Sequence, residues 1–214
     1  MKIPFKVISV LNQKGGVGKT TLAVHVATAF SQQGAKVLLL DADPQGSALD
    51  WAAVRPDATT FPVVGLPRPT LHRDIQSLLP DYDLIVIDGP PRVNELARSA
   101  IMASDLVLIP VQPSPYDIWA AKEIVDIIKD ASVFKENLKS AFVINRKIVN
   151  TAIGRDVSEA LSGYELPVLE SQICQRVLFA ESAASGMTVL EMEPDNVAAR
   201  EIQALVTEIK GGGL

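Results

Sequence analysis

The stretch LNQKGGVGKTT, residues 11–21, decides the fold of this 214-residue chain. It follows an apolar strand pattern over residues 6–11 and opens a helical pattern over 19–33, which is the setting of a phosphate-binding loop. Its glycines let backbone N–H groups turn inward without Cβ clashes, and the helix N-terminus adds further donors. The sequence therefore predicts an anion cradle suited to the phosphates of a nucleotide.

Within this cradle we expect Lys19 to reach the β- and γ-phosphates, Thr20 to ligate Mg²⁺ and Thr21 to bond the α-phosphate. The other members of the cradle are Gly15, Gly16, Val17 and Gly18. The usual pattern, G-x-x-x-x-G-K-[ST], begins with a glycine where this chain has Gln13. A second lysine, Lys14, follows that position and needs an explanation of its own.

Short apolar runs alternate with helical patterns along the rest of the chain. Such runs are typical of strands covered on both faces, so we expect an α/β fold with a mostly parallel sheet flanked by helices on both faces. The expected strands lie at 6–11, 36–41, 84–88, 106–111 and 141–145, with weaker candidates at 61–64 and 166–170. The expected helices lie at 19–33, 46–54, 93–103, 117–131, 152–162 and 195–210. This organisation predicts a single P-loop NTPase domain over residues 1–210 and a flexible tail over 211–214.

Carboxylates end two of the expected strands. LLLDADPQ carries Asp41 and Asp43, and LIVID ends in Asp88. Open α/β sheets bind ligands at the carboxyl ends of their strands, so these side chains are expected beside the glycine loop. Asp88 matches the strand-end aspartate that holds Mg²⁺ in P-loop proteins. For Asp41 and Asp43, capping of the helix over 46–54 is the alternative.

The segment KGGVGKT resembles the deviant Walker A box of the ParA/MinD family of ATPases, and DADPQ resembles the Walker A′ element of that family. The segments IPVQPSPYDIWAA (109–121) and QRVLFAESAASGMTVLE (175–191) also look like this family, above all its short plasmid-type (ParF-like) partition ATPases. The resemblance extends over essentially the whole chain. It implies a P-loop fold of the deviant Walker type, with ATP and Mg²⁺ as cofactors and weak basal ATP hydrolysis.

The resemblance assigns catalytic roles to Lys14, Lys19 and Asp43. Lys19 serves the nucleotide of its own subunit, whereas Lys14 reaches across a dimer interface to the phosphates held by the other subunit. Asp43 positions the attacking water, and Asp41 supports the magnesium shell together with Thr20 and Asp88. This implies a homodimer that forms with ATP.

Two residues after the strand at 141–145 receive further roles. The resemblance implies that Asn145 contacts the adenine, while Arg146 either stacks on the base or belongs to a basic surface. The chain has a net charge of −5, so binding to DNA needs a local basic patch. Residues 135–155 hold five basic residues and one acidic residue, which predicts either such a patch or a solvated face. The candidate DNA contacts are Lys139, Lys147, Arg155 and Arg176.

The function implied by the resemblance is an ATP-dependent sandwich dimer that binds DNA without sequence preference and positions plasmids or other cargo. A ParB-like or other adaptor protein would stimulate hydrolysis. The protein would be cytoplasmic and associated with the nucleoid when ATP is bound. Because the loop begins so near the N-terminus, we expect the short form of the family, which lacks an operator-binding extension.

The main alternative is a MinD-like ATPase of a membrane surface, which needs a basic amphipathic C-terminal helix. The polar side of residues 195–210 is not basic, because it holds Asp195, Glu201 and Glu208 against Arg200 and Lys210. We therefore expect this helix to pack on the domain and expect no membrane partner. A small-molecule enzyme on the same fold, such as dethiobiotin synthetase, is disfavoured by Lys14 and by DADPQG.

Overall fold

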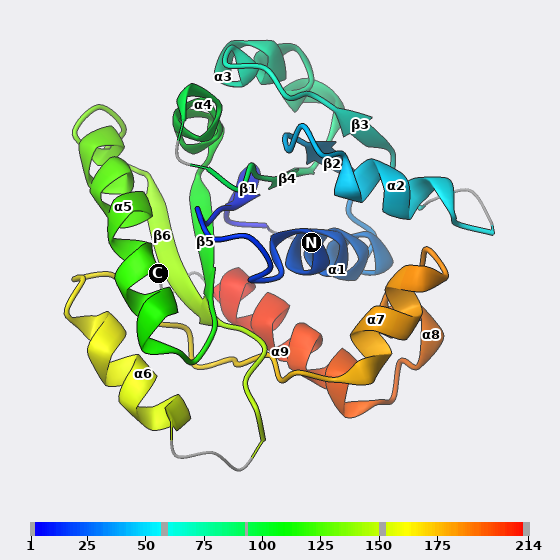
Figure 1. Ribbon diagram of the computed structural model, residues 1–214. Helices are drawn as coiled ribbons and strands as arrows, with labels where there is room; N and C mark the ends of the chain where they lie inside the picture. Colours follow the sequence, from blue (N-terminus) through cyan, green and yellow to red (C-terminus); the bar gives the residue numbers. More distant parts are fainter. Residues whose placement is uncertain (1–2, 57–59, 93, 150–152, 212–214) are drawn as a thin grey trace.

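Strand residues point alternately to two opposite apolar layers. In β2 (Val37–Asp41), Leu38 and Leu40 pack in one core, whereas Val37 and Leu39 pack in the other. The other strands are β1 (Val7–Val10), β3 (Val63–Gly65), β4 (Leu84–Asp88), β5 (Leu106–Val111) and β6 (Lys139–Ile144). All neighbouring pairs are parallel, in the order β3-β2-β4-β1-β5-β6 (Figure 1). This computed structural model describes residues 3–56, 60–92, 94–149 and 153–211, except for the side chains of 153–156.

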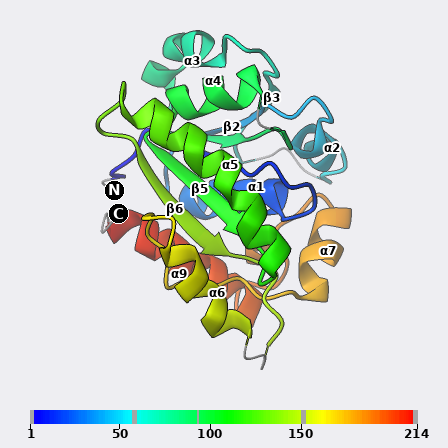
Figure 2. The same ribbon diagram turned by 60° about the vertical axis from the view of Figure 1, so that its left-hand side comes forward.

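Helices cover both faces of the sheet. One core contains residues of α1 (Lys19–Gln32), α2 (Ser47–Ala53), α7 (Val177–Ala184), α8 (Val189–Met192) and α9 (Val197–Gly211). The other contains residues of α3 (Leu71–Asp74), η1 (Ile75–Ser77), α4 (Glu95–Ala103), α5 (Pro115–Ser132) and α6 (Ile153–Ser162). A further short turn, η2, spans Leu79–Asp81. Figure 2 shows α5 lying across β5 and β6, so the two-sided covering expected from the apolar strands is confirmed.

The predicted elements agree with the observed ones to within two residues at the boundaries that the structure describes. The predicted starts at 93 and 152 lie outside the described residues, as do 212–214 of the predicted tail. Gly211 was also assigned to that tail but is the last residue of α9. The short helices α3, α7 and α8, with η1 and η2, were not predicted, because three to eight residues carry too little helical periodicity.

The weak strand candidate at 166–170 is wrong as a strand. Only an isolated bridge joins Val168 to Phe142 of β6, and Phe142 exchanges hydrogen bonds with Pro167 O and Leu169 N at 2.9 Å each. Proline lacks the N–H group that a continuing ladder requires, so pairing with this edge of the sheet stays local.

The C-terminal helix packs on the domain, as its sequence pattern predicts. Its apolar face is buried in the core beside α1, with side chains Ala198, Ala199, Ile202, Leu205, Val206 and Ile209. This face is therefore not free to enter a lipid surface. In the part of the chain that the structure describes, no helix has both the length and the apolar character needed to cross a bilayer.

His25 of α1 joins this helix to the C-terminal part of the fold. Its Nε2 accepts a hydrogen bond from Val189 N at 3.1 Å, so its Nδ1 carries the proton that is donated to Thr21 O at 2.6 Å. The ring is buried, and this burial lowers the pKa of His25 to about 4. A neutral imidazole therefore connects the first turns of α1 and of α8.

Replacing His25 with leucine leaves the Val189 N–H buried without an acceptor. We expect His25→Leu to lower the free energy of unfolding by about 1–3 kcal/mol at pH 7, measured by urea denaturation. As pH falls from about 6.5 to 4, the unfolded wild-type chain protonates His25 before the folded one does, which destabilises the wild type. The difference in unfolding free energy between the wild type and His25→Leu should therefore narrow over this range. A variant as stable as the wild type at pH 7 would contradict the role given to His25.

Candidate nucleotide-binding site

Glycine is required where the loop turns into α1. Gly18 precedes the helix with a φ of 91°, and Gly16 has a φ of 76°, both in the left-handed region that favours glycine. A Cβ on Gly18 would also collide with Nδ2 of Asn145, which lies directly against it. The local sequence therefore keeps the start of α1 open, with its free N–H groups available to an anion.

Side chains from the ends of β5 and β6 brace the loop from outside. Asn145 Nδ2 donates to Val17 O at 2.7 Å, which leaves its carbonyl oxygen available for a ligand. Gly16 O accepts from Arg146 Nη1 at 2.7 Å and from Gln112 Nε2 at 3.0 Å. Arg146 has a φ of 54°, so its backbone adopts the left-handed conformation that is uncommon outside glycine. Asn145 and Arg146 thus border the loop, and the base contacts that the resemblance implies for them stay predictions.

The residue that departs from the usual glycine pattern also has a structural role. Gln13 Nε2 donates to Ala120 O of α5 at 2.7 Å. A glycine at this position could not make that bond. The departure from the usual loop sequence therefore ties the loop to a helix on the opposite face of the sheet from α1.

The two loop lysines make different contacts. Lys19 is 7% exposed, and its ammonium lies 3.2 Å from Lys14 O. Burial lowers the pKa of Lys19, while the charges of Asp88 and Asp43 oppose that shift. Lys14 points away from this pocket, and its ammonium forms an ion pair with Asp117 on α5 at 2.6 Å.

The Asp88 carboxylate is the least compensated group of the site. It ends β4 in direct register with Asp41 of β2, and it is fully buried. Neither of its oxygens has a hydrogen-bond partner among the described residues. Burial raises the pKa of Asp88 to about 7, with Asp41 adding to the shift and the Thr20 hydroxyl and Lys19 opposing it. A buried carboxylate beside a threonine hydroxyl fits a divalent cation.

The carboxylates of Asp41 and Asp43 differ in what they contact. Asp41 Oδ2 accepts from the backbone N–H groups of Ala48 and Leu49 at 2.9 and 3.1 Å, and Oδ1 accepts from Asp43 N at 3.0 Å. Asp41 therefore caps α2, the alternative that the sequence left open, and any support to magnesium would be indirect. Asp43 uses Oδ1 for Gln45 N at 2.9 Å and lines the cleft above the loop.

Within the described part of the chain, no group of three or more histidine, cysteine, aspartate or glutamate side chains is arranged to hold a metal by itself. Mg²⁺ is commonly held by one or two protein oxygens together with substrate phosphates and water. The fitting donors here are the Thr20 hydroxyl and Asp88.

A cleft of about 1200 Å³ extends from the loop along the start of α7. Its far wall was not predicted as part of the site, although the resemblance had singled out residues 175–191 by sequence. The wall is contributed by Ile173, Cys174, Gln175, Arg176, Val177 and Phe179. Glu201 of α9 holds this segment, accepting from Cys174 N at 3.0 Å and pairing with Arg176 at 2.5 Å. Burial raises the pKa of Cys174, so its thiol stays protonated at neutral pH.

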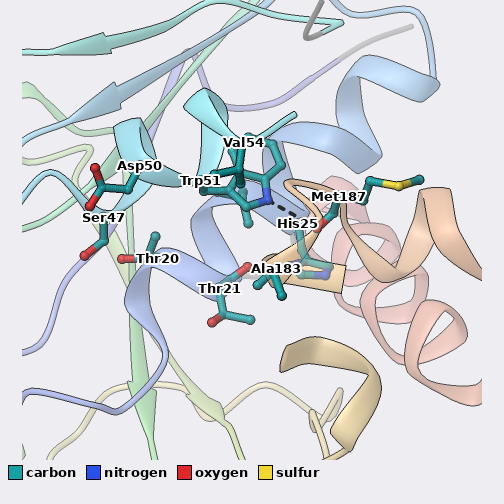
Figure 3. Close-up of a pocket in the computed structure, with 11 residues that line it drawn as sticks. Thr20, Thr21, His25, Ser47, Asp50, Trp51, Val54, Ala183 and Met187 are labelled. Atoms are coloured by element: carbon teal, nitrogen blue, oxygen red, sulfur yellow. Dashed lines mark hydrogen bonds between the residues drawn. The ribbon is translucent and has the colours of Figure 1, made fainter. Parts of the chain in front are cut away.

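A smaller, mostly apolar pocket of about 360 Å³ adjoins the cleft between α1, α2 and α7 (Figure 3). It shares Thr20, Thr21, Ser47 and Ala183 with the cleft. Trp51 forms part of its wall and donates from Nε1 to Met187 O at 3.2 Å. This contact connects α2, which follows the Asp41–Asp43 turn, to the α7–α8 segment.

The basic stretch at 135–155 does not form one patch. Lys139 begins β6 and Lys147 follows its end, so a six-residue strand of about 20 Å separates them. Lys147 donates to Gln172 Oε1 at 2.6 Å, and Arg176 is neutralised by Glu201. The side chain of Arg155 lies outside the described residues. Of the two alternatives for this stretch, the spacing of Lys139 and Lys147 along β6 favours the solvated face, and DNA binding through these residues stays a prediction.

A glycine loop opening a buried helix, with strand-end carboxylates beside it, defines a P-loop nucleotide-binding protein. Residues 8–189 match the family model described as the CobQ/CobB/MinD/ParA nucleotide binding domain, and the chain belongs to that family. This confirms the expected family and the expected α/β fold.

Relatives and solved structures agree with this assignment. The chain is 30% identical over 207 residues to "Maintenance of carboxysome distribution protein A" of Halothiobacillus neapolitanus, covering 94% of this chain and 95% of that protein. It is 26% identical to the "Chromosome-partitioning ATPase Soj" of Thermus thermophilus, covering 94% of each. The fold matches an ATP complex of McdA from Cyanothece with a TM-score of 0.81 at 18% identity, covering 98% of each chain. It also matches MinD of Pyrococcus horikoshii with Mg-ADP, with a TM-score of 0.77 at 21% identity and 97% of each chain covered.

Removing the buried charge of the site should stabilise the nucleotide-free protein. Because the pKa of Asp88 is about 7 when folded and near 4 when unfolded, the folded state retains a proton that the unfolded state releases between these pH values. This group therefore costs stability increasingly as pH rises from about 4 to 7. We expect Asp88→Asn to raise the unfolding free energy by about 1–3 kcal/mol at pH 8, with little gain at pH 4.5.

The measurement for Asp88 is urea denaturation at both pH values, without nucleotide or magnesium. An Asp83→Asn variant, at the exposed start of the same strand region, controls for the loss of a carboxylate in general. A gain for Asp88→Asn of equal size at the two pH values would contradict the buried-charge explanation.

Proposed function

We propose that this protein is a ParA-type ATPase whose ATP-bound form is a sandwich dimer that positions cargo. The observation that carries this proposal is the pair of lysines in one loop. Lys19 points into its own cleft, whereas Lys14 points outward toward α5 and is 38% exposed. A lysine directed away from its own phosphate site does not serve that site, and a second subunit could bring its phosphates to it.

ATP and Mg²⁺ are the cofactors, and the reaction is the hydrolysis of ATP. The glycine loop and Lys19 bind the phosphates, and Thr20 and Asp88 supply oxygens to the metal, which neutralises phosphate charge during hydrolysis. Asp43 lines the cleft next to the loop and positions the attacking water. The solved structures of similar fold that contain ATP or Mg-ADP support this assignment.

The surface beside Lys14 supports a second copy of the chain as its partner. Tyr116 and Trp119 of α5 are 73% and 66% exposed. Their rings pack edge to face, with the ring centroids 5.5 Å apart. Exposed large aromatic side chains are enriched at protein–protein interfaces. In the dimer, these rings would be covered while Lys14 of each subunit reaches the nucleotide of the other.

The dimer would bind DNA without sequence preference. This would place the protein on the nucleoid within the cytoplasm. The relatives named for chromosome partitioning and for carboxysome distribution support a cargo-positioning role. The cargo is a plasmid or another large body, linked through a ParB-like or other adaptor that stimulates hydrolysis. A MinD-like membrane cycle is disfavoured, because the apolar face of α9 is buried against α1.

Two variants separate assembly from chemistry. With Mg-ATP, Asp43→Ala should dimerise but hydrolyse at least about tenfold more slowly, because it loses only the positioning of water. Lys14→Ala should bind ATP but remain monomeric at concentrations where the wild type dimerises. Light scattering gives the masses, and phosphate release gives the rates. A stable ATP dimer of Lys14→Ala would contradict the contact in trans.

Binding to DNA is tested with unrelated duplexes and a non-hydrolysable ATP analogue. The ATP-state dimer should bind all duplexes alike, and the ADP state should bind much more weakly, because dimerisation doubles the phosphates neutralised together. Affinity should fall roughly tenfold between 50 and 200 mM salt if each dimer neutralises two phosphates. Sedimentation with anionic liposomes, but not with DNA, would instead favour the membrane-surface alternative.

A further inference from the structure

Lys14 is paired on its own subunit in a contact that the proposed dimer would have to break. Its ammonium lies 2.6 Å from Oδ2 of Asp117, which belongs to the first turn of α5. The lysine is 38% exposed at its side chain, whereas the aspartate is 2% exposed. A partly exposed cation is therefore held by a buried anion.

Within the described residues, Asp117 has little else to compensate its charge. Its Oδ1 is buried and has no hydrogen-bond partner there. Its position in the first turn of α5 gives some support through the helix dipole, which is a modest contribution. Lys14 is accordingly the main counter-ion of this carboxylate.

We propose that Asp117 is a positioning residue that holds Lys14 in cis and thereby sets the ATP and protein concentrations at which the dimer forms. This inference rests on the proposed function, because it takes the partner's phosphates as the destination of Lys14. Asp117 and those phosphates are competing anions for one ammonium group. The dimer forms when the triphosphate and the rest of the interface outweigh the cis pair.

Physical chemistry favours release of Lys14 over a bridge to both anions. A carboxylate kept beside the partner's triphosphate would place negative charges next to each other at a buried interface, which is unfavourable. Release in turn leaves Asp117 buried without its cation, and removing one partner of such a pair is costly. That cost opposes dimerisation until ATP is present in both subunits.

The loop also places this pair next to the nucleotide. Lys19 contacts the carbonyl oxygen of Lys14, and Lys14 N donates to Asn12 Oδ1 at 3.0 Å. A bound triphosphate would draw the Lys19 ammonium from that carbonyl. Gln13, the neighbouring residue, is bonded to α5 at Ala120 O. The Gln13 side chain therefore holds the start of the loop to the first turns of α5 beside the Lys14–Asp117 pair.

The test is Asp117→Asn, which removes the charge and keeps the shape. The chain has two tryptophans, and Trp119 is 66% exposed whereas Trp51 is 6% exposed. A blue shift of Trp119 fluorescence therefore reports the covering of this face when a non-hydrolysable ATP analogue is titrated, and light scattering confirms the mass. We expect Asp117→Asn to dimerise at a protein concentration roughly tenfold lower than the wild type.

A matched control lies on the same helix. Asp126 forms an exposed ion pair with Lys122 at 2.5 Å, so Asp126→Asn removes an aspartate–lysine pair from α5 without touching the loop. Its dimerisation should equal that of the wild type. Circular dichroism checks the fold of each variant, and Asp117→Ser provides a second neutral replacement if the asparagine variant is unstable.

The decisive readout is dependence on Lys14, which a merely structural role of Asp117 would not produce. In the Lys14→Ala background, Asp117→Asn should give no gain in dimerisation, because no lysine remains to be released. An equal gain in that background, or weaker dimerisation of Asp117→Asn itself, would overturn the proposal. If neither the wild type nor Asp117→Asn dimerises with the analogue, the proposed function fails as well; if only the gain is missing, the sandwich dimer stands and the role of Asp117 does not.

Discussion

A buried, uncompensated carboxylate constrains the nucleotide end of this molecule. Asp88 ends a central strand and is fully buried, and neither of its oxygens has a hydrogen-bond partner in the part of the chain that the structure describes. The parallel sheet places Asp41 beside it, and Lys19 approaches from the loop that follows the neighbouring strand. Folding alone therefore leaves the charge of Asp88 without compensation, which the proposed Mg²⁺ and phosphates would supply.

Asp41 and Asp43 lie at the end of the same strand but have different surroundings. Asp41, still within β2, directs both oxygens to backbone N–H groups and holds the start of α2. Asp43, two residues later, is in the turn and remains beside the open cleft. Glu201 of α9 fixes the opposite wall through Cys174 and Arg176. Asp41 and Glu201 thus fix the backbone on two sides of the cleft, whereas Asp43 remains beside its open space.

The sequence predicted those features that depend on local patterns. Apolar runs predicted the central strands, and the glycine loop predicted the turn that opens α1, because both signals lie within a few consecutive residues. The basic stretch is spread out in space, since β6 places Lys139 and Lys147 at the two opposite ends of one strand. The pairing of Lys14 with Asp117 joins residues 103 positions apart, and no local pattern encodes such a contact. The buried state of Asp88 likewise depends on helices packed from both faces.

Gln13, which stands where the usual loop pattern has a glycine, joins the loop to α5. Its amide is bonded to α5, the helix that carries Asp117 and the exposed ring of Trp119. A displacement of the loop by bound phosphate would therefore strain the start of α5, and covering of α5 by a partner would restrict the loop. Coupling of this kind needs only a shared hydrogen bond and two packed elements, because binding at either end changes the free energy of the same contact.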